Sequence, residues 1–271
     1  MPAARPVPDS VLDRLWAAGC VAADEEAEEL WAAAPDDATV EAWLRRREQG
    51  EPLAWITGTL PFCGRTLRVD PGVYVPRYQT EDLARRAATL LAAATAAAAT
   101  AAAAAGPGAA RAVDLCTGAG AIAAHLRAEV PGAAVVGVDI DPLAVACARR
   151  NGVPAVQADL DRPPLRTAAF DLVTAVAPYV PTGEMAFLPA DVQRYEPRRA
   201  LDGGDDGLDL VRRVVAAAGR LLRRPGGWLL TEVGGDQHDL LRPALDAAGF
   251  GPATPWFDED GDLRGLAAPV R

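Results

Sequence analysis

Residues 113–123, VDLCTGAGAIA, place a glycine-containing turn between an apolar run and a helical pattern. Gly118 and Gly120 lack side chains, so a ligand can approach backbone N–H groups at the start of the following helix. Asp139 ends the next apolar run, where a carboxylate can accept hydrogen bonds from both ribose hydroxyls of a nucleoside. The combination predicts a nucleoside site, whereas an isolated glycine pair or a lone turn carboxylate would equally describe a turn that binds nothing.

The charges around this turn indicate which nucleoside would bind there. The spacing Gly118-x-Gly120-x-x-Ala123 satisfies the dinucleotide fingerprint, so an NAD-type dehydrogenase is one alternative. However, Asp114 just before the turn would repel a pyrophosphate and attract the ammonium of a methionine moiety. Asp159 ends a third strand, where it can accept from an adenine amino group. S-adenosylmethionine, which has an amino acid, a ribose and an adenine but no phosphates, fits three such carboxylates.

A second candidate site follows the apolar run FDLVTAV at 170–176. The run is rich in β-branched residues and ends in Ala177-Pro178-Tyr179, which is typical of a strand that delivers a rigid turn to a site at its carboxyl end.

The elements that position these residues alternate between strand and helix. We expect strands at 111–116, 134–139, 155–159, 170–176 and 226–233, with helices between them at 121–130, 142–151, near 206–223 and at 237–248, and two final strands around DEDGD. This alternation predicts an α/β fold with a doubly wound, mostly parallel sheet. Ligands of such a sheet bind beyond the carboxyl ends of its strands, where the strand order reverses.

The first 76 residues have a different texture. Residues 1–50 predict a small N-terminal helical domain of two or three helices, because apolar residues recur at helical spacing after the Asp9-Ser10 cap. Residues 51–76 contain short β-like pieces, LAWITG, TLRV and GVYVP, which indicate a β-hairpin connector. Residues 77–271 form the remaining domain.

Composition excludes several functional classes. A net charge of −10 and a pI near 4.8 argue against a nucleic-acid surface. The four cysteines are scattered and only two histidines are present, so we expect neither a metal site nor a disulfide framework, as in a reducing cytoplasm. We expect no membrane association, because residues 1–10 lack an apolar signal core and the uncharged run 87–105 consists mainly of Ala and Thr.

Several motifs together resemble the HemK/PrmC-type protein-(glutamine-N5) methyltransferases, which are class I enzymes that methylate a side-chain amide in peptide-chain release factors. They are GEPLAWITG at 50–58, VYVPRYQTEDL at 73–83, VDLCTGAGAIA, GVDIDPLAVACARRN at 137–151, the APYVP turn, YEPRRALDGGDDGLDL at 195–210 and TEVGGDQ at 231–237. The resemblance covers nearly everything after residue 50. It implies a seven-stranded, Rossmann-like class I methyltransferase sheet preceded by a helical substrate-recognition part.

The resemblance also assigns residues. It implies that S-adenosylmethionine is bound by Asp114, Cys116, Thr117, Gly118, Ala119, Gly120, Asp139, Ile140, Asp159 and Leu160. Arg77, Thr80 and Glu81 match a stretch near the cofactor or form a helix cap. Glu196 and Arg198 either line the acceptor channel or pair with each other.

The acceptor turn departs from the family pattern. The family has Asn-Pro-Pro-Tyr where this chain has Val176, Ala177, Pro178 and Tyr179. In the family the Asn oxygen and a backbone carbonyl accept the two N–H groups of the amide and aim its nitrogen at the methyl group. Val176 has no such acceptor, and an unpaired buried N–H costs about 1–3 kcal/mol.

Three hypotheses follow from these patterns. The first is a methyltransferase whose partner is a protein with a release-factor-like glutamine loop. The second keeps S-adenosylmethionine but has a small-molecule nitrogen, oxygen or carbon nucleophile as acceptor, which Val176 favours. The third is a cofactor-binding protein without transferase activity.

Overall fold

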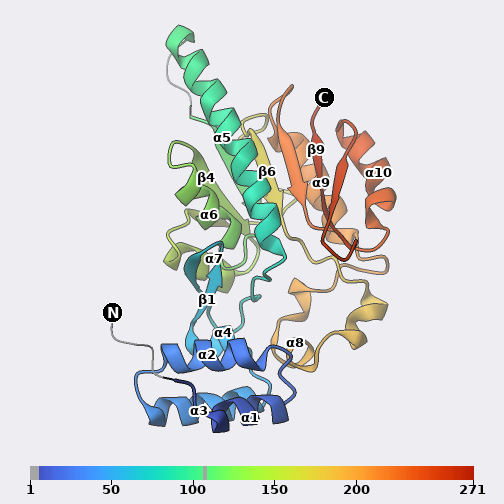
Figure 1. Ribbon diagram of the computed structural model, residues 1–271. Coiled ribbons are helices and arrows are strands. Elements are labelled where there is room, and N and C mark those ends of the chain that lie inside the picture. The colour runs from blue at the N-terminus through green and yellow to red at the C-terminus, as the bar shows by residue number, and fades with distance from the viewer. Residues whose placement is uncertain (1–5, 106–108) are drawn as a thin grey trace.

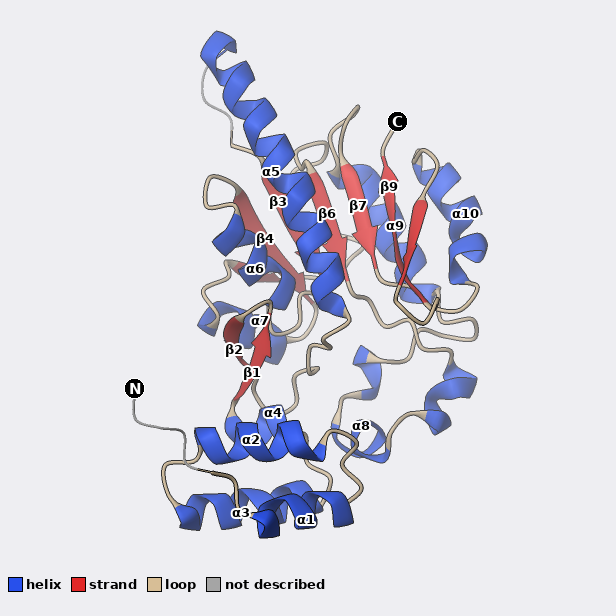
Figure 2. Ribbon diagram, viewed as in Figure 1, coloured by secondary structure: helices blue, strands red, loops and turns tan. Residues whose placement is uncertain are grey.

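The computed structural model describes residues 6–105 and 109–271, so the first five residues of the N-terminal segment 1–10 lie outside it. At its centre is a seven-stranded sheet with the order β5-β4-β3-β6-β7-β9-β8 (Figures 1 and 2). The strands are β3 (Arg111–Leu115), β4 (Ala134–Asp139), β5 (Ala155–Gln157), β6 (Leu172–Ala175), β7 (Trp228–Thr231), β8 (Thr254–Phe257) and β9 (Leu263–Pro269). All pairs from β5 to β7 are parallel, and β9 is antiparallel to β7 and β8.

Helices cover both faces of the sheet because side chains alternate along each strand. In β6, Leu172 packs with α5 (Thr80–Ala105), α6 (Ala121–Glu129) and α7 (Pro142–Arg150) on one face. The next residue, Val173, packs with α9 (Asp209–Leu221) on the other face, together with α10 (Gln237–Ala248). The chain leaves β3 toward β4 and β5, and then returns to β6 and β7 on the opposite side of β3. The order therefore reverses beside β3, as the doubly wound prediction requires.

The N-terminal residues form three helices with their own small core. These are α1 (Asp9–Ala17), α2 (Ala23–Ala33) and α3 (Asp37–Glu48), and their buried contacts include Leu15, Leu30 and Leu44. Asp36 caps α3 by accepting from the Thr39 backbone N–H at 2.8 Å. They lie on the side of the sheet toward which the carboxyl ends of the strands point (Figure 1).

The connector is an antiparallel hairpin of β1 (Thr59–Phe62) and β2 (Arg65–Arg68), preceded by a short helix α4 (Leu53–Thr57). The β-like reading of LAWITG is wrong, because these residues form α4. Pro52 precedes the first turn, where its missing N–H costs nothing, and Gly58 ends the helix with a φ of 77°. The GVYVP piece contains no strand either.

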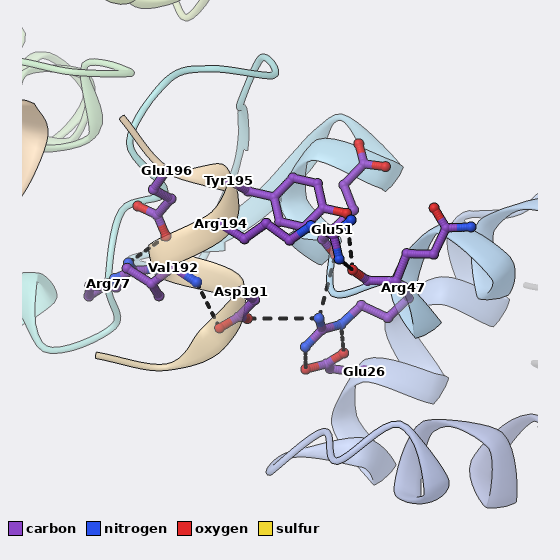
Figure 3. A network of polar contacts seen from close by, with 10 residues as sticks. Glu26, Arg47, Glu51, Arg77, Asp191, Val192, Arg194, Tyr195 and Glu196 are labelled. Atoms are coloured by element: carbon purple, nitrogen blue, oxygen red, sulfur yellow. Dashed lines mark hydrogen bonds and ion pairs between the residues drawn. The ribbon is translucent and has the colours of Figure 1, made fainter. Parts of the chain in front are cut away.

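One buried arginine connects the N-terminal helices to the rest of the molecule (Figure 3). Arg47 on α3 makes a two-pronged ion pair with Glu26 on α2, at 2.5 and 2.9 Å. It also donates to the Glu51 carbonyl at 3.4 Å and lies 3.8 Å from Asp191 on α8 (Ala190–Tyr195). Tyr195 on the same helix donates to the Gln49 carbonyl at 3.0 Å. The segment between β6 and α9, which contains α8 and the 3-10 helices Thr182–Phe187 and Arg198–Ala200, is thereby fixed against the helices.

None of the described helices, α5 included, has the run of apolar residues that crossing a bilayer requires.

We expect Arg47→Ala to lower the free energy of unfolding by roughly 2–3 kcal/mol, because it leaves the Glu26 carboxylate half-buried without its partner. Urea unfolding monitored by tryptophan fluorescence measures the change. Arg45→Ala is the matched control: its pair with Glu41 is exposed on the same helix, so its loss has little effect on stability. Equal effects of the two substitutions would show that Arg47 does not hold this junction.

Candidate active site

A cavity opens beyond the carboxyl ends of the central parallel strands, beside the reversal in strand order. It encloses about 830 Å³ outside the protein atoms, counting its open mouth, which lies within the range of small-molecule sites. Six predicted cofactor residues line it: Cys116, Gly118, Asp139, Ile140, Asp159 and Leu160. They lie at the end of β4 or shortly after β3, β4 and β5. The parallel pairing of these strands therefore brings together residues that are far apart in the sequence.

The two glycines of the turn have different physical roles. Gly118 has a φ of 55°, and a Cβ there would meet no atom within 4 Å, so the backbone is open to a ligand. Gly120 has a φ of 83°, and a Cβ there would lie 3.0 Å from Ala148 Cβ on α7. Gly120 therefore allows close helix packing rather than ligand contact. Thr117, Ala119 and Gly120 are absent from the cavity wall.

Asp139 has the geometry of a ribose-binding carboxylate. One oxygen accepts from the Gly118 N–H and the other from the Asp141 N–H, both at 2.9 Å. Each carboxylate oxygen can accept a further hydrogen bond, so two hydroxyls of a ligand in the cavity find acceptors. Burial raises the pKa of Asp139, and the two backbone N–H groups oppose that rise.

The charges of the cavity favour a cationic nucleoside over a dinucleotide. Its wall contains the carboxylates of Asp139, Asp141 and Asp159 and the guanidiniums of Arg199 and Arg213. Arg199 pairs with Asp141 at 2.5 Å and Arg213 pairs with Asp159. Both cations of the wall are thus paired, which leaves the negative charge of Asp139 for the ligand. A sulfonium nucleoside matches that charge, whereas a pyrophosphate does not.

The structure gives Asp114 a role different from the predicted ammonium contact. Its side chain is 1% exposed and does not reach the cavity wall. Its two oxygens accept from the hydroxyls of Thr117 at 2.6 Å and Thr174 at 2.7 Å. Burial raises the pKa of Asp114 to about 6, against the effect of both hydroxyls. Asp114 therefore anchors the turn that carries Gly118.

A second and larger hollow lies between the N-terminal helices and the sheet; we call it the cleft. It encloses about 2480 Å³ including open solvent, and its walls include Cys20 and Arg47 on one side and Val176, Ala177, Pro178 and Tyr179 on the other. Tyr74, Val176, Pro178 and Ala200 line both the cleft and the cofactor cavity. The predicted acceptor turn is therefore the wall at which the two spaces meet.

A glycine-rich loop fixes the acceptor turn. The Val180 N–H donates to the Leu201 carbonyl at 3.0 Å, and the Val180 carbonyl accepts from Gly203 at 2.8 Å. A Cβ on Gly207 would lie 2.2 Å from the Tyr179 carbonyl oxygen. A Cβ on Gly203 would lie 2.7 Å from the Pro178 carbonyl oxygen, so Gly203 and Gly207 are required for the loop to approach the acceptor turn so closely. Gln237 adds a side-chain hydrogen bond to the Tyr179 carbonyl at 2.9 Å.

The residues for which the sequence left two alternatives make contacts within the protein. Arg77 stacks on the Tyr74 ring and pairs with Glu196 at 2.6 Å. Arg198 pairs with Asp202, so the predicted pair between Glu196 and Arg198 is wrong. Glu81 accepts from the Cys63 N–H at 2.7 Å and ties the hairpin to α5. Among the described residues, no cluster of Cys, His, Asp and Glu side chains has the arrangement of a metal site.

Sequence reasoning missed several wall residues. Tyr74, Asp141, Arg199 and Arg213 line the cofactor cavity, and Glu232 lines the cleft. Tyr74, Asp141 and Arg199 fall inside motifs already quoted for the resemblance, and these motifs could have identified them as site residues. Glu232 follows β7 and lies in the quoted motif TEVGGDQ, so both its strand-end position and that motif gave a signal for a role in the site.

The sheet order, the acidic strand tips and the cavity beside the order reversal together define a class I S-adenosylmethionine-dependent methyltransferase. The residues present fit this methyl donor, because Asp139 offers acceptors for the ribose hydroxyls and Gly118 leaves the backbone open. The two arginines of the cavity wall are paired with carboxylates, so neither is free to bind a phosphate. Residues 112–194 match the family described as a methyltransferase domain.

Comparisons with known proteins give the family. The chain is 38% identical over 213 residues to the release factor glutamine methyltransferase of Geobacter sulfurreducens, covering 76% of this chain and 69% of that protein. It is 38% identical over 214 residues to the enzyme of the same name from Moorella thermoacetica, covering 76% and 70%. The chain belongs to the release factor glutamine methyltransferase family.

Two further comparisons extend the picture. A 4-amino-L-phenylalanine/4-methylamino-L-phenylalanine methyltransferase from Streptomyces pristinaespiralis is 37% identical over 208 residues, covering 75% of this chain and 68% of that protein. The hMettl16 catalytic domain in complex with MAT2A 3'UTR hairpin 6 superposes with a TM-score of 0.56 at 14% identity, covering 89% of this chain and 82% of that one. The second likeness shows the fold alone.

We expect Asp139→Ala to weaken S-adenosylmethionine binding by about tenfold or more, because the ligand loses charge-assisted hydrogen bonds and the Gly118 turn loses its anchor. Titration calorimetry measures the dissociation constant. Asp82→Asn, an exposed carboxylate on α5, is the control and leaves the affinity unchanged. An unaltered affinity in Asp139→Ala would show that the donor does not bind at this strand tip.

Glu232 also generates a prediction about stability. Burial raises its pKa from 4.5 to about 7, so the folded protein holds a proton there that the unfolded chain releases. Stability contributed by this proton is lost as the pH rises from 4.5 through 7. We therefore expect Glu232→Gln to raise the free energy of unfolding, relative to the unsubstituted protein, by up to about 3 kcal/mol more at pH 8 than at pH 4.

Urea unfolding at the two pH values measures this difference. Glu129→Gln is the control, because the exposed Glu129 has its pKa lowered by Arg65 and gives no such gain at high pH. A Glu232→Gln effect that is equal at both pH values would rule out a proton held at Glu232.

Proposed function

We propose that this enzyme transfers the methyl group of S-adenosylmethionine to the side-chain amide nitrogen of a glutamine in a release-factor-like protein loop, in the cytoplasm. The observation that carries the proposal is the shared wall of the cofactor cavity and the cleft at Val176 and Pro178. A loop lying in the cleft can bring one nitrogen to that wall, where the donor cavity begins. The four free cysteines suit a reducing compartment.

The cleft has features of a protein-binding surface. Val21 and Tyr78, which line it, are 94% and 78% exposed, and Phe187 beside the lining residue Leu188 is 85% exposed. Apolar side chains gathered around one opening favour a macromolecular partner. The walls come from the N-terminal helices, the segment before α5 and the segment around α8, so an extended loop can be contacted from several sides.

The residues of this chain contribute to the reaction chiefly by positioning. When it is bound, S-adenosylmethionine supplies an electrophilic methyl carbon on its sulfonium. Asp139 and the Gly118 backbone hold the nucleoside part, while Pro178 and Val176 form the wall across which the nitrogen faces that carbon. Tyr179, half-buried and fixed by Gln237 through its carbonyl, supplies a flat surface against a planar amide. Partial enclosure by the N-terminal helices limits the access of water.

A second candidate acceptor is a small aromatic amine. Val176 favours it, because an amine nitrogen is a better nucleophile than an amide nitrogen and depends less on a side-chain oxygen at this position to accept its N–H groups and aim it. The relative from Streptomyces pristinaespiralis, named for 4-amino-L-phenylalanine and its methylamino derivative, lies within the same range of identity.

The test combines wild-type protein with Val176→Asn and, as the matched control, Val176→Ala. A glutamine-containing release-factor loop peptide is incubated with S-adenosylmethionine, and the methylated glutamine is measured by mass spectrometry. We expect methylation by the wild type and a rise in kcat/KM of about tenfold in Val176→Asn, which adds a hydrogen-bond acceptor, but no rise in Val176→Ala. No methylation of the loop by any variant, with turnover of 4-amino-L-phenylalanine by the wild type, would replace the first acceptor by the second.

A further inference from the structure

Glu232 lies beside Val176 at the tips of two adjacent parallel strands. Ala175 on β6 pairs with Thr231 on β7, and the Glu232 N–H donates to the Ala175 carbonyl at 3.2 Å. Val176 comes directly after Ala175, and Glu232 comes directly after Thr231. Both side chains therefore project from the same face of the sheet. Both line the cleft. A carboxylate therefore stands next to the position where the family pattern has an amide oxygen.

The Glu232 carboxylate is buried and incompletely satisfied. The residue is 6% exposed, and within the described part of the chain its Oε1 has no hydrogen-bond partner. Buried polar atoms in folded proteins are nearly always paired, and an unpaired one costs free energy. The hydroxyls of Thr80 and Tyr179 lie near enough to the carboxylate to favour its charged form, as does Arg264.

The other principal charges of the cleft have partners. Arg47 pairs with Glu26, Arg77 with Glu196, and Arg264 with Asp258. Glu232 makes no ion pair within 4 Å among the described residues. Its free oxygen is thus available to a ligand that enters the cleft and carries a hydrogen-bond donor.

We propose that Glu232 binds the methyl acceptor: its Oε1 accepts a hydrogen bond from the N–H of an amide or amine nitrogen, and so supplies from β7 the acceptor that Val176 lacks on β6. The inference rests on the proposed transfer function. It names the substrate class as a nitrogen nucleophile with at least one N–H to donate. Tyr179, which neighbours Glu232, then borders the same nitrogen from the strand that carries the acceptor turn.

The hydrogen bond also accounts for the proton that the reaction releases. The nitrogen lone pair forms the new N–C bond while the S–C bond of the sulfonium breaks, and sulfur keeps the electron pair as a neutral thioether. The nitrogen then loses one proton, which passes to the Glu232 carboxylate and from there to solvent. Charge balances, because one cation and one carboxylate become a neutral thioether and a carboxylic acid.

The groups that face Glu232 leave it as the titrating group of this cluster near neutral pH. Burial raises the pKa of Tyr74 to about 12 and raises that of Tyr179 further. Arg264 remains protonated, since its pKa is raised by Asp258. Protonation of Glu232 removes the charge that accepts the N–H, so acceptor turnover falls as the pH drops below about 7.

The experiment compares wild-type protein with Glu232→Ala, Glu232→Gln and the surface control Glu129→Ala. Two probes serve as acceptors, a glutamine-containing release-factor loop peptide and 4-amino-L-phenylalanine. Binding of each probe is measured by calorimetry with S-adenosylhomocysteine present, and methylation is followed by mass spectrometry from pH 5.5 to 9. Calorimetry with S-adenosylmethionine alone reports the cofactor site.

We expect Glu232→Ala to lower kcat/KM for the accepted probe about 100-fold and to weaken probe binding at least tenfold, with cofactor affinity within twofold of the wild type. Glu232→Gln keeps part of the activity but loses the fall below pH 7, and Glu129→Ala behaves as the wild type. Thermal unfolding verifies that each variant is folded. If Glu232→Ala does not fold, Glu232→Gln decides the question by its pH profile.

The outcomes separate this inference from the proposed function. Methylation of the peptide with unchanged kinetics in the Glu232 variants overturns the role of Glu232 and leaves the proposed function intact. Turnover of 4-amino-L-phenylalanine alone, lost in Glu232→Ala, supports Glu232 and overturns the release-factor proposal. Failure of both probes to bind the wild type overturns both.

Discussion

Asp114 accepts hydrogen bonds from two hydroxyls that belong to the two halves of the active site. Thr117 lies in the turn that carries Gly118 toward the cofactor cavity, and Thr174 lies on β6 two residues before Val176. One buried carboxylate thus ties the donor side to the acceptor side across adjacent strands. Because charge-assisted bonds are short and directional, this link fixes the relative placement of the two turns.

The neighbouring strand is adapted to this link. A Cβ on Gly137 of β4 would lie 2.8 Å from the Thr117 hydroxyl oxygen. A glycine in the middle of a strand is otherwise unfavourable, since it loses more backbone entropy on folding than other residues and contributes no side-chain packing. Here it leaves room for Thr117 to turn inward to Asp114. The glycine-rich loop at 203–207 does the same for the acceptor turn, so both halves of the site depend on positions without a side chain.

The distribution of charge around the two hollows follows one principle. Most charged groups of their walls are paired within the described part of the protein, and two carboxyl groups that make no ion pair there, Asp139 and Glu232, lie at the tips of β4 and β7. Unpaired charge at a partly buried site costs stability, and such sites are where ligands bind. Among the described residues, the cofactor cavity and the cleft therefore each present one carboxyl group without an ion pair, and these two groups flank the wall at Val176 and Pro178.

The sequence was sufficient to predict the sheet because its strands and helices follow simple periodicities. The helix predicted at 237–248 coincides with α10, and the predicted strands overlap β3 to β7. Local pattern failed at LAWITG, where apolar and β-branched residues look like a strand but Pro52 and the packing of Trp55 favour a helix. Trp55 donates to the Val73 carbonyl at 3.0 Å, a contact made 18 residues away.

Side-chain direction was the other limit. Asp114 and Asp139 both lie at the carboxyl ends of strands, and the sequence does not reveal which one faces the cavity. The hydroxyl partners of Asp114 come from residues 3 and 60 positions away, so its inward orientation depends on strand pairing. The same holds for Glu232, whose importance emerges from its place beside Val176 in the sheet. Residue types at strand ends were predictable, whereas their contacts required the register.

The cleft is built from two separable parts of the chain. Its outer wall belongs to helices in the first fifty residues, which pack on a core of their own and contact α8 through Arg47 and Asp191. Its inner wall belongs to the residues that follow β6 and β7. Because the outer wall has a core of its own, the surface of these helices can change without altering the packing of the sheet, so the shape of the cleft and the geometry of the strand tips can vary independently.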